Sequence, residues 1–306
     1  MEESAPEADA AIHTVGLSKA YGVVRAVDEL SMTVPRGEIF GFLGPNGAGK
    51  TTSVKLLTGL SNATSGKAWV LGKPVGDVAT RRRIGYLPEM FRYQPWMSAL
   101  EVLNLHCELA DVPSSERRAE TEEALVTVGL ADRANDRVVT FSKGMQQRLG
   151  LGVALLGKPE LVFLDEPTSA LDPVGRKEVR DIIVSLRDRG TTVFLNSHLL
   201  SEVQQVCDRV AVVERGRVVA SGTMQELLGS GEVRIRVTDL DEAGMQAIAP
   251  FGTASWSDDL LTVVGVTPER VPDLVAELVR AGARVHSVER GRQTLEERFI
   301  QLLDHS

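Results

Sequence analysis

The segment from Gly44 to Thr52, with the sequence G-P-N-G-A-G-K-T-T, limits the possible folds of this chain more than any other stretch. It fits the pattern G-x-x-x-x-G-K-[ST], in which glycines let successive backbone N–H groups curl around a polyphosphate. Residues 38–43 before it predict a short buried strand, and residues 53–60 after it predict a helix whose N-terminus adds a positive dipole end. The sequence therefore predicts a phosphate-binding loop between a strand and a helix.

Every residue of this loop is a candidate ligand of ATP. Lys50 is expected to reach the β- and γ-phosphates, and the hydroxyl of Thr51 is expected to ligate Mg²⁺. The alternative is a glycine-rich turn that holds no ligand, and the surrounding strand and helix count against it. The predicted ligands in the loop are Gly44, Pro45, Asn46, Gly47, Ala48, Gly49, Lys50, Thr51 and Thr52.

Length and charge set further bounds. The 306 residues, 43% of them hydrophobic, predict two domains, and the net charge of −8 argues against a general nucleic-acid binder. Two cysteines suit a reducing compartment. Residues 1–11 are acidic and rich in alanine, which predicts a disordered tail instead of a targeting peptide. The longest charge-free apolar run, residues 149–157, is far shorter than the ~20 residues of a membrane span.

The alternation of apolar and polar residues predicts the core elements. Between residues 12 and 37 it predicts an antiparallel sheet, and between residues 97 and 130 it predicts helices. Apolar runs that end beside acidic or polar residues predict central parallel strands and a doubly wound α/β core. The predicted strands are 13–17, 23–27 and 30–34, a pair at 67–71 and 83–87, and the core strands 161–164, 192–195 and 209–213, with a helix at 199–207.

The segment Gly-Ser-Gly at 229–231 predicts a linker, so we expect a tail (1–11), an ATPase domain (12–229) and a C-terminal domain (230–306). The C-terminal domain is expected to be a small α+β domain of the split-βαβ, ferredoxin-like type. No catalytic constellation is apparent in it, which favours a structural or regulatory role. Its predicted strands are 233–237, 260–266 and 284–288, and its predicted helices are 241–249, 268–281 and 294–303.

Two carboxylates, Asp165 and Glu166, follow the apolar run 161–164. The carboxyl end of a central strand beside a phosphate loop is where such groups meet a ligand. Asp165 is expected to hold Mg²⁺ through a water molecule, and Glu166 is expected to orient or deprotonate the water that attacks the γ-phosphate. An acidic turn without this function is the alternative.

The segment 141–148, F-S-K-G-M-Q-Q-R, opens a predicted helix with Ser142 as its N-cap. It resembles the signature sequence L-S-G-G-Q of ATP-binding-cassette (ABC) ATPases, and its form resembles the ATP-binding subunits of ABC-2-type exporters. The residues Phe141, Lys143 and Met145 depart from that pattern. The resemblance implies that Ser142, Lys143 and Gly144 contact the γ-phosphate of ATP, through a hydroxyl and backbone N–H groups.

Other positions match this family in the expected order. Tyr21 matches the aromatic residue that stacks on adenine, although an edge-strand tyrosine half in the core is the alternative. His198 matches the switch histidine at the γ-phosphate, and residues 169–172 resemble the D-loop. Residues 85–89 stand in the place of the Q-loop with Glu89 instead of glutamine, and its carboxylate is predicted to ligate Mg²⁺.

The resemblance implies an ATPase of two subunits, in which the signature helix of each subunit faces the phosphate loop of the other. We expect a subunit that forms a homodimer, with pairing to a different ATPase subunit as the alternative, and that uses ATP and Mg²⁺ to drive export through a separate membrane permease. We expect it at the cytoplasmic face of the membrane. The sequence does not determine the transported substrate, which could be a drug or a lipid among others. The aromatic residues in 90–100 either receive a short permease helix or pack within the helical subdomain.

Two other functions are consistent with these motifs. One is a soluble ABC ATPase without a permease, and the other is a nucleotide sensor that binds ATP without turnover. The presence of Glu166 and His198 counts against the sensor, because both residues are expected to serve hydrolysis.

Overall fold

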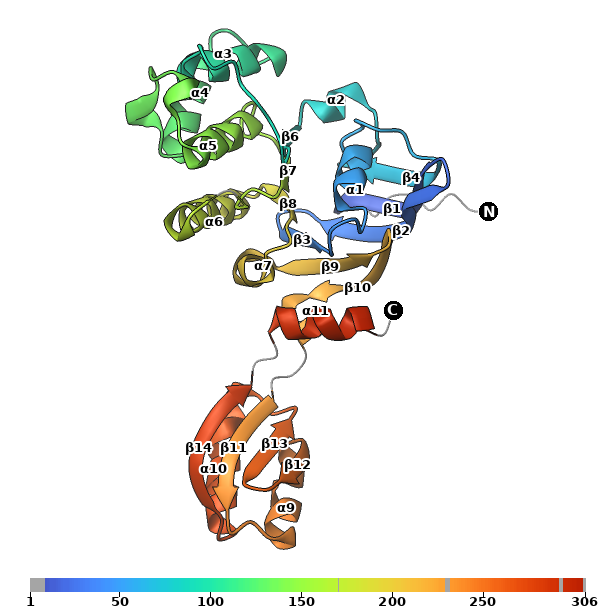
Figure 1. The fold of residues 1–306 in the computed structure, drawn as a ribbon, viewed down its shortest axis with the longest axis vertical. Coiled ribbons are helices and arrows are strands. Elements are labelled where there is room, and N and C mark those ends of the chain that lie inside the picture. The colour runs from blue at the N-terminus through green and yellow to red at the C-terminus, as the bar shows by residue number, and fades with distance from the viewer. Residues whose placement is uncertain (1–8, 170, 229–231, 292–293, 305–306) are drawn as a thin grey trace. The chain divides into compact units, whose positions relative to one another are not determined.

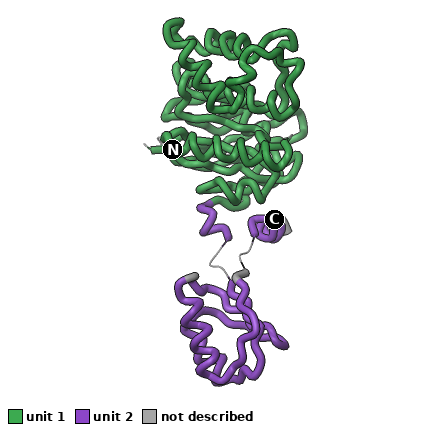
Figure 2. The backbone as a smooth tube through the Cα atoms, turned by 90° about the vertical axis from the view of Figure 1, so that its left-hand side faces the viewer, with its two compact units in different colours: residues 1–221 green, residues 222–306 purple. Residues whose placement is uncertain are grey.

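The computed structural model describes residues 9–169, 171–228, 232–291 and 294–304. The chain forms two compact units, residues 1–221 and 222–306 (Figure 2). The predicted linker 229–231 and residues 1–8 of the predicted tail lie outside the described residues. Strand β1 begins at Ala10, and both Ala10 and Ala11 are buried, so the first strand starts inside the stretch expected to be a tail.

A six-stranded sheet forms the centre of the first unit (Figure 1), in the strand order β10-β9-β3-β8-β7-β6. The pairs β3–β8, β3–β9, β7–β8 and β6–β7 are parallel, which confirms the doubly wound core. Every residue of β3, β7 and β8 is buried, as expected for strands covered on both faces. The strands are β3 (Ile39–Leu43), β6 (Ile84–Leu87), β7 (Leu161–Asp165), β8 (Thr192–Asn196), β9 (Arg209–Glu214) and β10 (Arg217–Thr223).

Helices pack around this sheet and form a separate helical subdomain. The green helices of Figure 1, α3, α4 and α5, make that subdomain, and α3 begins with a capping box between Ser98 and Glu101. The longer helices are α1 (Lys50–Leu57), α3 (Ala99–Leu109), α4 (Arg117–Thr127), α5 (Lys143–Ala154), α6 (Pro173–Asp188) and α7 (Leu200–Val206). Shorter ones are α2 (Val78–Arg81) and the 3₁₀ turns Ala131–Arg133 and Val138–Thr140.

The antiparallel sheet predicted from residues 12–37 is present, in the order β2-β1-β4-β5. It consists of β1 (Ala10–Tyr21), β2 (Val24–Pro35), β4 (Ser65–Val70) and β5 (Lys73–Pro74). The prediction of separate strands at 23–27 and 30–34 is wrong, because β2 runs through both. Glu29 takes a positive φ of 53°, and the register with β1 shifts nearby, so a bulge lets the strand continue past a residue that looks like a turn.

The predicted pairing of 67–71 with 83–87 is also wrong. Strand β4 pairs with β1 in the antiparallel sheet, whereas β6 pairs with β7 in the parallel sheet. Helix α2, at residues 78–81, lies between the two strands in the chain, which passes from one sheet to the other there. Closeness in sequence therefore does not make these two strands neighbours.

The second unit contains a four-stranded sheet in the order β12-β13-β11-β14, with all the neighbouring strands antiparallel. With helices α9 and α10 this is the ferredoxin-like arrangement expected from the sequence. Strand β12 was not predicted, because only two of its five residues are apolar. The elements are β11 (Glu232–Thr238), α9 (Glu242–Ile248), a 3₁₀ turn (Ala249–Phe251), β12 (Thr253–Ser257), β13 (Leu260–Val264), a second 3₁₀ turn (Pro268–Arg270), α10 (Val271–Arg280) and β14 (Arg284–Gly291).

Two further helices flank this module in the chain, α8 (Met224–Leu228) before it and α11 (Leu295–Asp304) after it. They contact each other. Each begins with a reciprocal cap, Thr223 with Glu226 and Thr294 with Glu297. Leu227 and Leu295 are both buried, hence apolar burial and capping together explain why these short segments form helices.

Candidate functional site

A cavity of about 400 Å³ lies where the phosphate loop meets the carboxyl ends of the core strands. Nine of its eleven lining residues were predicted from the sequence as site residues. The other two are Ala26 on β2 and Asn196 at the end of β8. The lining residues are Ala26, Asn46, Gly47, Gly49, Lys50, Thr51, Thr52, Glu89, Glu166, Asn196 and His198.

The loop needs its glycines for two different reasons. Gly47 and Gly49 have φ values of 82° and 96°, in the left-handed region that favours glycine. Gly49 also lies so close to β2 that a Cβ atom there would come within 2.0 Å of the carbonyl oxygen of Ala26. A side chain at either position would strain the backbone, and at Gly49 it would also displace β2, so the loop conformation follows directly from the motif.

Lys50 lies inside the curve of the loop. Its Nζ donates to the carbonyl oxygens of Gly44 at 2.8 Å and Pro45 at 3.2 Å, and the side chain is 7% exposed. Burial lowers the pKa of Lys50, while the charges of Glu166, Asp165 and Glu89 oppose that change. The buried ammonium group thus faces three carboxylates, an arrangement suited to a ligand that carries both phosphate and a divalent cation.

Asp165 is fully buried at the end of β7. Its Oδ1 accepts a hydrogen bond from the amide of Asn196, and within the described chain its Oδ2 has no hydrogen-bond partner. Burial first, and then the charges of Glu89 and Glu166, raise the pKa of Asp165 to about 6. A buried carboxylate oxygen without a partner, close enough to Lys50, Glu89 and Glu166 to feel their charges, fits a divalent cation.

No group of three or more His, Cys, Asp and Glu side chains within the described ranges could hold a metal ion alone. Mg²⁺ ordinarily takes most of its ligands from phosphate oxygens and water, so its binding beside ATP does not require such a group.

Glu166 and His198 face each other across the cavity. Glu166 has a positive φ of 54°, and its backbone N–H donates to the carbonyl oxygen of Asn196 at 2.9 Å. Its Oε2 lies 2.8 Å from Nδ1 of His198, whose side chain is about half exposed at 49%. A non-glycine residue in this conformation costs on the order of 1 kcal/mol, and such strain is concentrated at functional sites. The turn thus places a carboxylate and an imidazole on the same cavity.

The predicted signature residues do not line this cavity. Ser142 caps α5 by accepting a hydrogen bond from the backbone of Met145 at 3.2 Å, and Ser142 and Lys143 are exposed while Gly144 is half-buried. Tyr21, 52% exposed near the end of β1, lies outside the lining too, and the Nζ of Lys19 sits 4.9 Å from its ring centroid. The loop residues Gly44, Pro45 and Ala48 shape the loop without lining the cavity.

Sequence reasoning missed Asn196. The signal was present, because Asn196 ends β8 exactly as Asp165 ends β7, and the two residues are register partners in adjacent parallel strands. Polar residues that end neighbouring parallel strands meet at one edge of the sheet. Asn196 therefore holds the orientation of Asp165.

The aromatic segment after Glu89 divides into packed and exposed residues. The rings of Phe91 and Tyr93 lie 5.3 Å apart, Tyr93 contacts His106 at 5.5 Å, and burial raises the pKa of Tyr93. Met90 and Trp96 are 86% and 68% exposed. Part of this segment thus stabilises the helical subdomain, and part is available to a partner.

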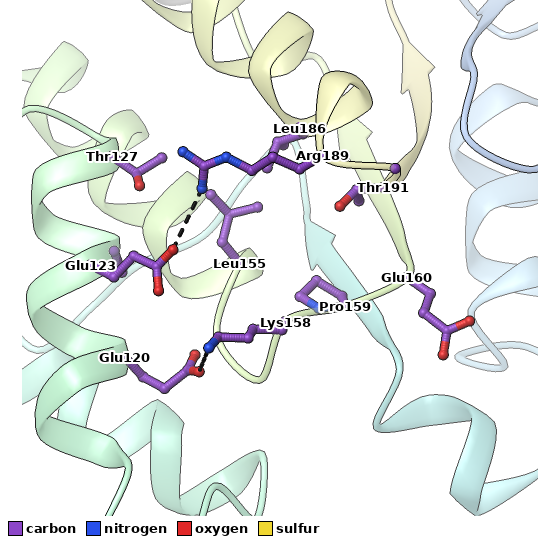
Figure 3. A pocket seen from close by; sticks show the side chains of 12 residues that line it. Glu120, Glu123, Thr127, Leu155, Lys158, Pro159, Glu160, Leu186, Arg189 and Thr191 are labelled. Carbon is purple, nitrogen blue, oxygen red and sulfur yellow. Dashed lines mark ion pairs between the residues drawn. The ribbon is translucent and has the colours of Figure 1, made fainter.

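A second cavity, of about 350 Å³, lies between α4, the end of α6 and the turn before β7 (Figure 3). Two ion pairs connect α4 to the residues opposite it, Glu120 with Lys158 at 3.4 Å and Glu123 with Arg189 at 3.5 Å. None of the predicted site residues lines it. Each charged side chain that lines it has an ion-pair partner, whereas one carboxylate oxygen of Asp165, near Lys50, has no partner among the described residues.

Comparison with known proteins adds three findings. The family model described as ABC transporter matches residues 27–169. The chain is 39% identical to an uncharacterised ABC transporter ATP-binding protein of Synechocystis sp. (99% of this chain, 87% of that protein). It is 37% identical to the daunorubicin/doxorubicin resistance ATP-binding protein DrrA of Streptomyces peucetius (96% and 93%).

A similar solved structure is cbiO1 from Clostridium perfringens, described as part of the ABC transporter complex cbiONQ. It is 26% identical, with a TM-score of 0.64, over 72% of this chain and 90% of that one. Among the described residues, no helix is both long and apolar enough to cross a membrane. The relatives, 37–39% identical over at least 96% of this chain, show that the chain belongs to the family of ABC transporter ATP-binding subunits, in the ABC-2 exporter type that its signature segment resembles, and it is an ATPase.

Proposed function

We propose that two copies of this chain hydrolyse ATP at shared sites and thereby drive export through a separate membrane permease. One observation carries the proposal. The cavity gathers Lys50, Thr51, Glu166 and His198, whereas Ser142 and Gly144 stay outside it at the accessible N-terminus of α5. A helix N-terminus is a natural partner for phosphate, so the signature helix of one copy completes the site of the other.

Within such a site each side chain has a separate task. The ammonium group of Lys50 and the loop N–H groups bind the phosphates, while Thr51 and Asp165 would hold Mg²⁺, with Glu89 as a further candidate ligand. Mg²⁺ supplies charge neutralisation of the phosphate oxygens. Glu166 orients the attacking water and accepts its proton, and His198, 2.8 Å from that carboxylate, keeps it in place beside the γ-phosphate. Tyr21 would stack on adenine from the exposed end of β1.

Closure of the two copies depends on the γ-phosphate. Because Ser142 and the loop of the partner would both contact it, ATP favours the closed pair, and its hydrolysis removes those contacts. The energy of ATP is thereby coupled to a change of subunit arrangement.

The permease is the proposed recipient of that change. Exposed Met90 and Trp96 beside the Glu89 segment are suited to anchor a short helix of a membrane partner. The relative DrrA is named for drug resistance, and cbiO1 is described as part of a transporter complex. Both descriptions support export and a membrane partner, and we propose that this chain works at the cytoplasmic face of the membrane. The ATPase domain would span 12–229, and residues 230–306 would be an accessory domain.

A complementation experiment tests the shared site. Lys50→Ala should lose ATP binding because it removes the buried ammonium group, and Ser142→Arg should block α5 without affecting binding by the same chain. Each variant alone should hydrolyse little ATP. A mixture of the two contains pairs with one intact shared site, and we expect phosphate release to recover to about a quarter of the wild-type rate. A mixture as inactive as its components, with both variants folded, would show that one chain carries the whole site.

A further inference from the structure

The outer edge of the C-terminal sheet differs from its other edge. Strand β12, T-A-S-W-S, forms one end of the strand order and contains no charged residue and no proline. Strand β14 at the opposite end exposes Arg284, His286 and Glu289. Natural proteins protect sheet edges from pairing with another chain by charges, prolines and bulges. Only the β14 edge has such protection.

The free side of β12 is accessible. Within the part of the chain that the structure describes, β12 pairs only with β13, and four of its five residues are exposed (Figure 1). Its Trp256 is 42% exposed, so much of the indole meets solvent. The strand therefore offers unpaired backbone groups together with apolar surface.

We propose that β12 pairs with β12 of a second copy, antiparallel about a two-fold axis through Ser255. This joins two four-stranded sheets into one. A two-fold contact requires a surface that complements itself, and the sequence of β12 meets this requirement. Opposite residues in the new pair have numbers that add up to 510, so Ser255 faces Ser255 and Trp256 faces Ala254.

The proposed pairing places compatible side chains together on each face. Trp256 and Ala254 are the register partners of buried Leu261 and Val263, so both lie on the face that the helices cover. There the indole of each copy would cover the small Ala254 of the other. Ser255 is the partner of Thr262, on the opposite face, where the two serine residues meet without a clash or a charge.

The ends of the paired strands carry opposite charges. The same register brings the turn at Asp258 and Asp259 of one copy beside Phe251 of the other. The guanidinium of Arg270 lies over that ring, 4.7 Å from its centroid. Asp259 is 52% exposed, and its one ion pair within the described residues, with Arg236, is long at 3.7 Å. The two-fold axis repeats this complementary contact at both ends and places no like charges opposite each other.

This contact is short and buries little surface, so the association that it gives is weak. It does not involve the nucleotide-binding residues, so it is independent of nucleotide. It is distinct from the ATP-dependent closure proposed above, which involves the phosphate loop and α5. The Trp256–Ala254 fit and the charges at the strand ends favour a second copy of this chain over an unrelated extended peptide as the partner of β12.

Sedimentation of the full chain without nucleotide tests the contact. For wild type we expect the average mass to rise above the 33.1 kDa of one chain with concentration. Ser255→Lys places two like charges face to face on the axis and should keep the chain at the mass of one copy. Ser287→Lys, the same change on the same face of β14, should behave as wild type. A wild type that stays monomeric at all concentrations, or a Ser255→Lys variant that associates like wild type, would overturn the proposal.

Cross-linking gives a second, positive test. Residues opposite each other in antiparallel strands have Cα atoms about 4.5–5.5 Å apart, within the range of a disulfide. Under mild oxidation Ser255→Cys should form a covalent dimer, whereas Ser287→Cys and wild type, whose Cys107 and Cys207 are buried, should not. No more dimer from Ser255→Cys than from Ser287→Cys would contradict the pairing. Ser255→Lys combined with Glu166→Gln should still dimerise with ATP, and a loss of that dimer would refute two separate surfaces.

Discussion

The cavity around Lys50 and the N-terminus of α5 are both suited to bind phosphate, yet their surroundings in the protein differ. Lys50, Asp165 and Glu166 are buried, and each has contacts that fix its position. Ser142 is exposed, and its hydroxyl accepts a hydrogen bond from Met145 in the first turn of its own helix. The difference indicates that the cavity is organised before ATP arrives, whereas the signature residues lie exposed at a helix N-terminus, outside the cavity of their own chain.

The largest effect that tests this contrast is expected for Glu166→Gln. The amide keeps the shape of the side chain but cannot accept a proton, so hydrolysis should fall about 10²-fold or more while ATP binding persists. Phosphate release and equilibrium ATP binding measure the two properties separately. Glu123→Gln, on exposed α4, serves as the control and should hydrolyse ATP normally. Normal turnover by Glu166→Gln would remove Glu166 from catalysis.

A smaller effect is expected at Ser142, and two substitutions separate its two roles. Ser142→Ala removes the N-cap of α5, which should lower the free energy of unfolding by about 1 kcal/mol and reduce hydrolysis about tenfold to a hundredfold. Ser142→Asp restores a cap, so the free energy of unfolding should recover, but its carboxylate repels the γ-phosphate and hydrolysis should stay low. Denaturant unfolding and phosphate release are the measurements. If hydrolysis recovered together with stability, Ser142 would only be a cap.

The smallest effect concerns stability and the buried Asp165. Its pKa of about 6 in the folded chain exceeds the ordinary value of 3.8, so the folded state binds its proton more tightly between those two pH values. The free energy of unfolding of the nucleotide-free chain therefore falls as the pH rises from 3.8 to 6 and stays lowered above it.

Asp165→Asn removes the free-energy cost of keeping an ionised carboxylate buried at this position. At pH 8 we expect it to stabilise the nucleotide-free chain by on the order of 1–3 kcal/mol, with a gain that shrinks as the pH falls below 6 toward 4. Urea unfolding at several pH values measures this gain. The same variant should lose the stabilisation that Mg²⁺ and ATP together give to wild type. Equal or lower stability of Asp165→Asn at every pH would show that burial of this carboxylate costs nothing.

Sequence predicted the local parts of this site well. The phosphate loop, the strand before it and the helix after it depend on residues 38–60, and the glycines that fix the loop belong to the motif itself. The placement of Asp165 and Glu166 at the end of a central strand also followed from one apolar run. These features need no knowledge of distant residues.

What sequence did not show depends on distant contacts. The hydrogen bond from Asn196 to Asp165 joins residues 31 positions apart, and it exists only because β7 and β8 are neighbours in the sheet. The bulge at Glu29 and the different sheets of β4 and β6 likewise follow from tertiary pairing. Strand β12 escaped prediction because serine and threonine take the places of an apolar run, so its conformation comes from pairing with β13.

The contact between α8 and α11 has a consequence for how such a protein can change. After α8 the chain forms the module from Glu232 to Gly291, and α11, which follows the module, contacts α8. The module is therefore an insertion between two helices that contact each other, and a short turn could replace it while both helices stayed together. A stop codon after Leu228 would instead remove α11, so α8 would lose this contact. The whole module could thus be gained or lost as one unit without separating α8 from α11.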